Sequence, residues 1–136
     1  MTNTNELRYK RRCVFNLHIH LVFITKYRRC IFEKAHFEEM KKIFNKVSKD
    51  FQAELKELNG EKDHVHLLVN YPPMISVSKL VNSLKGVSSR LLRKSFPELE
   101  KYYIKKALWS PSYFAGSCGG ASIDTIRKYI EKQQSC

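Results

Sequence analysis

Two histidines separated by one residue are the first feature of this sequence that could do chemistry. Residues 63–69 read Asp-His-Val-His-Leu-Leu-Val. Alternate side chains of a β-strand point to opposite faces, so an extended stretch places His64 and His66 on one face and apolar residues on the other. Two neutral imidazoles on one face can bind one metal ion. The same spacing also occurs where histidines only hydrogen-bond to loops, and we expect His18 and His20, which repeat it, to be structural.

A tyrosine and a glutamine near the C-terminus could complete such a site. Tyr129 and Gln133 are four residues apart, so on a helix they share one face. A phenol with a pKa of about 10 is a weak nucleophile at neutral pH unless a neighbouring group, such as a metal ion acting on the electrophile, assists it. The amide oxygen of Gln133 beside two imidazoles makes a donor set that suits Mg²⁺ or Mn²⁺. The alternative is that Tyr129 only packs in the core and Gln133 is only solvated.

The charge of the chain points to a polyanionic partner. The 136 residues, enough for one domain, include 25 Lys and Arg against 13 Asp and Glu, a net charge of +12. Charge alone does not separate DNA from RNA or from a membrane surface. The candidate phosphate-binding side chains lie near the N-terminus, in a basic turn after the first strand and on the second helix. They are Arg11, Arg12, Lys26, Arg28, Arg29, Lys85, Arg90 and Arg93.

The cysteines and apolar runs exclude several classes of protein. Four cysteines, at positions 13, 30, 118 and 136, are scattered without a Cys-x-x-Cys pair, so we expect no structural zinc site. The N-terminus lacks an apolar signal core, and no run approaches the roughly 18 apolar residues of a membrane span. These features predict a reduced, cytoplasmic protein.

The periodicity of apolar residues predicts an α+β fold of one domain covering residues 1–136. We expect strands at 14–26, 53–58, 63–69 and 107–116, helices at 33–51 and from 76 to about 96, and a last helix at 122–133. Asn59-Gly60 predicts a hairpin turn, Gly119-Gly120 a hinge and Ser122 a helix cap. This order is that of the split βαβ, ferredoxin-like fold, an antiparallel sheet with two helices on one face. The last helix, which carries Tyr129, is appended to it.

Some aromatic residues fit either packing or recognition. We expect Trp109, Tyr113 and Phe114 to pack in the core, although exposed rings of this kind can stack on nucleic-acid bases. His36 is expected on the surface of the first helix.

Several motifs occur in the same order as in a known family. Residues 20–29, 63–69, 84–90, 108–114 and 126–133 together closely resemble the small single-tyrosine HUH transposases, the TnpA type of the simplest bacterial and archaeal insertion sequences. The resemblance covers almost the whole chain. It implies that His64, His66 and Gln133 bind a divalent metal, and that Tyr129 attacks the scissile phosphate of single-stranded DNA. A 5′-phosphotyrosine and a free 3′-hydroxyl would result.

The resemblance also implies partners. Such enzymes recognise hairpins near the ends of the element and act as homodimers in which the tyrosine helix of one subunit can complete the other subunit's site. Two alternatives remain at this point. One is a domesticated relative that acts on genomic palindromes, and the other is a non-catalytic ferredoxin-like module that binds nucleic acid. The strand motif with which such modules usually bind RNA is absent from the sequence.

Overall fold

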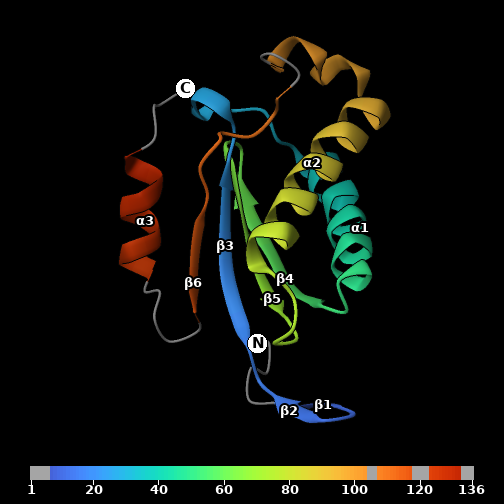
Figure 1. The fold of residues 1–136 in the computed structure, drawn as a ribbon. Coiled ribbons are helices and arrows are strands. Elements are labelled where there is room, and N and C mark those ends of the chain that lie inside the picture. Colours follow the sequence, from blue (N-terminus) through green and yellow to red (C-terminus); the bar gives the residue numbers. More distant parts are fainter. Residues whose placement is uncertain (1–6, 104–106, 118–122, 133–136) are drawn as a thin grey trace.

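A four-stranded antiparallel sheet forms the centre of the protein (Figure 1). The structure, a computed structural model, describes residues 7–103, 107–117 and 123–132. The strands are β3 (His18–Ile24), β4 (Glu54–Glu61), β5 (His64–Asn70) and β6 (Phe114–Ser117), in the order β4-β5-β3-β6. Helices α1 (Lys34–Asp50) and α2 (Val77–Ser95) cover one face, and α3 (Ile123–Glu131) lies on the other side, beside β6. The predicted ferredoxin-like arrangement with an appended helix is confirmed.

The two long helices form where apolar residues recur every three or four positions. On α1, Met40, Phe44 and Val47 are buried against the sheet. Helix α2 begins at the predicted position, because the Ser76 side chain accepts a hydrogen bond from the backbone N–H of Lys79. Its buried side chains include Leu80, Val81, Leu84 and Leu92. Both helices therefore pack on the same core face of the sheet.

The first strand differs from its prediction. The expected strand at 14–26 is broken after Phe15, and β2 (Cys13–Phe15) pairs instead with β1 (Arg8–Lys10) in a separate hairpin. The Arg8 guanidinium anchors this hairpin, since it donates to Asn70 Oδ1 and lies 5.0 Å from the centroid of the Phe15 ring. The basic residues after β3 form a 3-10 turn, η1 (Lys26–Arg28).

The turn before the histidine strand also differs from its prediction. Asn59 and Gly60 lie inside β4, and the turn is formed by Lys62 and Asp63. Gly60 pairs with Val65, and a Cβ atom added to it would lie 2.4 Å from the carbonyl oxygen of His64. The glycine is required there by the close approach of the neighbouring strand rather than by a turn.

The predicted strand at 107–116 is mostly irregular. Regular pairing is confined to β6, and before it only isolated bridge residues occur, at Ala107 and at Trp109, which pairs with Thr25. Pro111 lies in the irregular part, where it has no ladder hydrogen bond to lose. The expected polar connection contains a 3-10 turn, η2 (Pro97–Tyr102), with Leu99 buried.

Not every side chain is buried or bonded as the sequence predicted. Trp109 is in the core, as predicted, and its Nε1 donates to Ser88 Oγ at 2.9 Å. His36 is buried rather than exposed, because its Nδ1 accepts a hydrogen bond from the backbone N–H of Glu33 and caps α1. Cys13 is a free thiol but Cys30 is disulfide-bonded, so the expectation of fully reduced cysteines is wrong in this structure.

Within the residues that the structure describes, no helix is long and apolar enough to cross a membrane. The predicted hinge Gly119-Gly120, the predicted cap Ser122 and the predicted metal ligand Gln133 lie outside the described residues.

Two glycines, Gly60 in the β4–β5 ladder and Gly86 in α2, allow a matched test of the β4–β5 register. We predict that Gly60→Ala lowers the free energy of unfolding by about 1–3 kcal/mol, because the added methyl group meets the neighbouring backbone. Gly86→Ala is the control. A Cβ at Gly86 meets nothing within 4 Å, so alanine in this helix is expected to stabilise by about 0.5–1 kcal/mol. Urea unfolding measures both, and a Gly60→Ala variant as stable as the wild type would contradict the register.

Candidate active site

The two histidines of β5 lie on the face of the sheet opposite α1 and α2. Val65 and Leu67, which alternate with them, are fully buried in the core between sheet and helices. Pairing with β3 sets His64 opposite Ile24 and His66 opposite Val22. Because directly opposite residues of an antiparallel pair point to the same face, the histidine face also carries Val22 and Ile24. Two fully buried side chains thus support the imidazoles from the neighbouring strand.

His64 is held by a carboxylate. Its Nδ1 lies 2.8 Å from Asp63 Oδ1, and Arg28 Nε donates to Asp63 Oδ2 at 2.8 Å. Burial alone would raise the pKa of Asp63, but the hydrogen bonds from His64 and Arg28 outweigh burial and the pKa is lowered. Asp63 is therefore ionised and only accepts, so Nδ1 of His64 carries the hydrogen. The lone pair of Nε2 remains for a ligand.

His66 is in contact with a third histidine. Nε2 of His66 lies 2.8 Å from Nδ1 of His20, and the ring centroids are 5.0 Å apart. Burial lowers the pKa of both imidazoles, so both are neutral at pH 7 and one of the two nitrogens carries the shared hydrogen. The prediction that His20 is structural stays a prediction, and the structure shows that the residue lies beside His66. His18 is buried near Asn70, as a structural residue would be.

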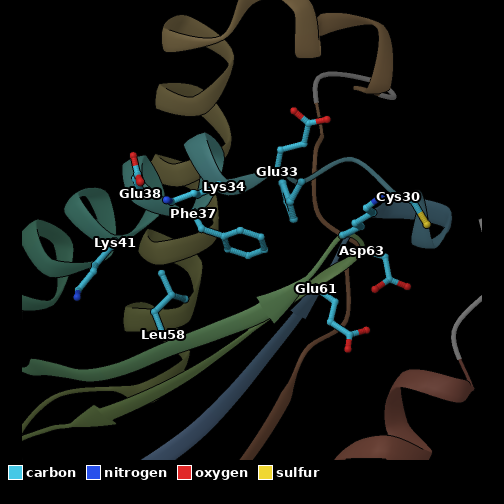
Figure 2. A pocket seen from close by; sticks show the side chains of 11 residues that line it. Cys30, Glu33, Lys34, Phe37, Glu38, Lys41, Leu58, Glu61 and Asp63 are labelled. Carbon is cyan, nitrogen blue, oxygen red and sulfur yellow. The ribbon is translucent and has the colours of Figure 1, made fainter.

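A glutamate also reaches this end of the sheet. Glu61, the last residue of β4, pairs with His64, and one ligand atom each from Glu61, Asp63 and His64 lie within 4.8 Å of one another. Figure 2 shows the two carboxylates close together at the tip of the β4–β5 hairpin. Sequence reasoning missed Glu61, and the only signal was its place at the end of a hairpin with the histidine strand. Imidazole nitrogens with carboxylate oxygens fit a divalent cation such as Mg²⁺ or Mn²⁺.

The same hairpin borders a large cavity, and Glu61 and Asp63 are among the residues that line it. Figure 2 shows this space of about 840 Å³ between the start of α1 and β4. Phe37 and Leu58 supply apolar lining, whereas Lys34, Glu38 and Lys41 supply charges of both signs. Such a mixed lining selects for no single ligand chemistry.

Tyr129 lies on the histidine face. Its hydroxyl is 3.0 Å from Ser112 Oγ, and its ring centroid is 5.7 Å from that of Phe114. Phe114 pairs with Val22, which pairs with His66 on its other side, so all three point to one face in one row across the sheet. Two strand spacings, about 10 Å, separate the backbones at the ends of this row. Burial raises the pKa of Tyr129, so its hydroxyl is protonated at neutral pH.

The predicted phosphate-binding residues fall into separate groups. Lys26, Lys85, Arg90 and Arg93 line one cavity of about 410 Å³ beside Trp109. Lys85 also donates to the carbonyl oxygens of Ser110, Pro111 and Ser112, at 2.7, 3.3 and 3.2 Å, and burial lowers its pKa. This lysine thus holds the segment that carries the partner of Tyr129.

The other basic residues lie elsewhere. Arg11 and Arg12 form the exposed turn of the β1–β2 hairpin, at the opposite end of the molecule from η1 (Figure 1). Arg28 is bound to Asp63, and Arg29 follows it in the chain.

Comparisons with known proteins identify the family. The family described as "Transposase IS200 like" matches residues 13–133. The chain is 30% identical over 128 residues to the ISDra2 transposase TnpA of Deinococcus radiodurans, covering 94% of this chain and 91% of that protein. It is 31% identical over 119 residues to the transposase for insertion sequence element IS200 of Salmonella typhimurium, covering 88% of this chain and 78% of that protein.

Solved structures agree with the fold. A crystal structure of a protein from Deinococcus radiodurans R1, described as a transposase, superposes with a TM-score of 0.83 at 31% identity and covers 95% of this chain and 99% of that one. The REP-associated tyrosine transposase bound to a REP hairpin superposes with a TM-score of 0.57 at 14% identity, covering 91% of this chain and 68% of that one, and shares the fold. The chain therefore belongs to the IS200-like transposases of the TnpA type, a family of enzymes that cleave DNA and transfer its strands.

Proposed function

We propose that this transposase cleaves and rejoins single-stranded DNA at the ends of its insertion sequence, in the cytoplasm, with Tyr129 as the nucleophile. The observation that carries the proposal is the row of Phe114, Val22 and His66, which places the ring of Tyr129 on the histidine face of the sheet. A nucleophile and a pair of metal-binding imidazoles on one face are the arrangement that phosphoryl transfer requires.

The covalent step balances without a nucleotide cofactor. The Tyr129 oxygen attacks the scissile phosphorus, and the bond from phosphorus to the 3′-oxygen breaks. The phenol gives up its proton and the leaving 3′-oxygen takes up one to become a 3′-hydroxyl, so the step releases no net proton. A 5′-phosphotyrosine is left. In the second step a 3′-hydroxyl attacks this phosphorus and the tyrosine oxygen leaves, so the energy of the phosphodiester bond is conserved.

His64, His66 and Gln133 are proposed to hold the divalent metal, Mg²⁺ or Mn²⁺. Bound there, the metal supplies polarisation of the scissile phosphate, which lowers the barrier to attack. The chain's own groups prepare the reactants. Asp63 holds the imidazole of His64. The Ser112 hydroxyl holds the hydroxyl of Tyr129 until DNA displaces Ser112 from it. Because the Tyr129 phenol is protonated at neutral pH, its attack on the phosphorus needs the polarisation of the phosphate that a bound metal supplies.

The two basic regions support a DNA substrate that runs along the molecule. The cavity with Lys26, Arg90 and Arg93 lies beyond one end of β3, and the β1–β2 hairpin with Arg11 and Arg12 lies before the other. The seven residues of β3 span about 23 Å, a length that suits a hairpin stem together with its single-stranded flank. We further propose a homodimer with composite sites. In such a dimer Tyr129 would act beside the histidines of the partner subunit, whereas in the single chain α3 packs on its own β6 through Tyr129 and Phe114.

The first prediction tests the nucleophile. The substrate is single-stranded DNA from the flanks of the element, with its label in the fragment that keeps the 5′-phosphate after cleavage. Incubated with the protein and Mn²⁺ or Mg²⁺, it should give a protein–DNA adduct that survives denaturing electrophoresis. Tyr129→Phe should abolish the adduct, because it removes the attacking oxygen, and His64→Ala or EDTA should reduce it at least tenfold. Tyr102→Phe, which removes a hydroxyl elsewhere, is the matched control.

The outcomes separate the competing functions. An adduct that persists in Tyr129→Phe overturns the assignment of the nucleophile. Tight hairpin binding with no adduct under any metal identifies a nucleic-acid-binding module instead of a strand transferase.

A second prediction tests the basic cavity. Replacing Lys26 or Arg90 by glutamine should weaken hairpin binding and lower the salt slope of log K by about 0.7–0.9 for each phosphate that the variant no longer neutralises. Lys42→Gln on the exposed side of α1 is the control, for which no change of slope is expected. Fluorescence anisotropy at several salt concentrations measures these slopes. If the cavity variants keep the wild-type slope, phosphate does not bind there.

A further inference from the structure

Asp63 connects a basic turn to the histidine strand. Its side chain is engaged on both oxygens, with Oδ1 at 2.8 Å from His64 Nδ1 and Oδ2 at 2.8 Å from Arg28 Nε. Its backbone carbonyl accepts from Thr25 twice, from the N–H at 2.9 Å and from Oγ1 at 3.2 Å. Asp63 is 8% exposed and Thr25 is fully buried. The carboxylate is therefore held by two partners, His64 and Arg28, and the backbone beneath it by Thr25.

Backbone conformation in η1 brings Arg28 to this carboxylate. Tyr27 and Arg28 both have left-handed φ, 61° and 52°, which is uncommon for residues other than glycine. The turn is closed by a hydrogen bond of 2.8 Å from the Arg28 N–H to the Thr25 carbonyl. A left-handed conformation is unfavourable for such residues and persists only where the surrounding structure fixes it. Here the ion pair with Asp63, 35 residues away in the chain, is one such constraint.

We propose that Arg28 and Asp63 are positioning residues that fix His64 in its Nδ1–H tautomer and present Nε2 to a divalent cation. This inference rests on the proposed metal site. A metal-binding histidine commonly donates its second ring N–H to a carboxylate, which sets both the tautomer and the orientation of the ring. Arg28 adds a further constraint, because it occupies the oxygen of Asp63 that is not bound to His64.

The role of Arg28 follows from its contact with Oδ2, the oxygen of Asp63 that His64 does not bind. If Oδ2 of Asp63 were unoccupied, the carboxylate could turn and release the Nδ1–H of His64, so the imidazole would no longer be held in one tautomer and one orientation. With Arg28 in place, both oxygens of Asp63 are already hydrogen-bonded. Nε2 is then the nitrogen of His64 that is left for a cation, and Glu61 is the other carboxylate of this cluster. His66 has a different neighbour, the His20 imidazole, so the two histidines are held by different chemistry.

The experiment measures Mn²⁺ affinity of the whole protein without DNA, by the electron paramagnetic resonance signal of free Mn²⁺. Asp63→Ala and Arg28→Gln should each weaken the affinity about 10- to 100-fold, and Arg28→Lys, which keeps the charge but not the fork of donors, should weaken it less. Asp50→Asn and Lys62→Gln are the charge-matched controls and should leave the affinity unchanged. Arg28→Gln should also leave the salt slope of DNA binding unchanged, which separates positioning from phosphate contact.

A second readout does not depend on metal or activity. Long-range ¹H–¹⁵N correlation spectra of histidine-labelled, metal-free protein, assigned with His64→Ala, should show a protonated Nδ1 and an unprotonated Nε2 for His64. In Asp63→Ala the ring should become a mixture of both tautomers. An Nε2–H tautomer in the wild type overturns the proposal, as does a wild-type Mn²⁺ affinity in Asp63→Ala.

Failure of the proposed metal site would look different. If His64→Ala keeps the full Mn²⁺ affinity, the cation does not bind at His64 and the metal assignment is wrong. The proposal that Nε2 of His64 is presented to a cation is then wrong as well. If His64→Ala loses affinity but Asp63→Ala and Arg28→Gln do not, the metal site stands and only the positioning role is wrong. Urea midpoints for each variant check folding, and should Asp63→Ala fail to fold, Arg28→Gln and the wild-type tautomer still decide.

Discussion

The alternation of buried and polar side chains on β5 is the constraint on which the rest of this structure depends. Val65, Leu67 and Val69 are fully buried against the helices, and burial of each such side chain contributes about 1.5–3 kcal/mol. A slip of one residue in the pairing would turn these three outward and drive His64 and His66 into the apolar core. Core packing therefore determines which face carries the imidazoles, far from any contact with a ligand.

The same register organises the opposite edge of the sheet. Since β3 pairs with β5 on one side and β6 on the other, Val22 sets His66 and Phe114 in one row. Phe114 then provides the ring on which Tyr129 packs. Lys85 holds the irregular segment that precedes β6 by bonding three consecutive carbonyls. The position of the tyrosine thus depends on a strand of only four residues and on one lysine of α2.

Local patterns in the sequence were enough to predict α1, α2 and the shared face of His64 and His66, because periodicity and burial determine these directly. The turn at Asn59-Gly60 was wrong because the dipeptide's local preference was overridden by the close approach of β5, which requires a glycine within the strand. His20 and Glu61 could not be placed from sequence. Each reaches the site only through the register of strands distant in the chain, and no local pattern contains that register. The role proposed for Tyr129 came from the resemblance to a family, because the neighbouring residues in the sequence alone left it open.

A cation site in a strongly basic protein has to overcome repulsion from the protein itself. The chain has a net charge of +12, an excess that suits the DNA backbone but opposes Mg²⁺ or Mn²⁺. Burial keeps His20 and His66 neutral, which removes two potential positive charges from the histidine face. Glu61 and Asp63 bring negative charge to the same end of the sheet, and the Asp63 pKa is lowered, so that charge persists at neutral pH. Part of the Asp63 charge is neutralised by Arg28, so at the proposed cation site Glu61 and a DNA phosphate would be the main compensation for the positive charge of the ion. If a cation occupies the proposed site, its binding is coupled to DNA binding, because each supplies the charge that the other lacks.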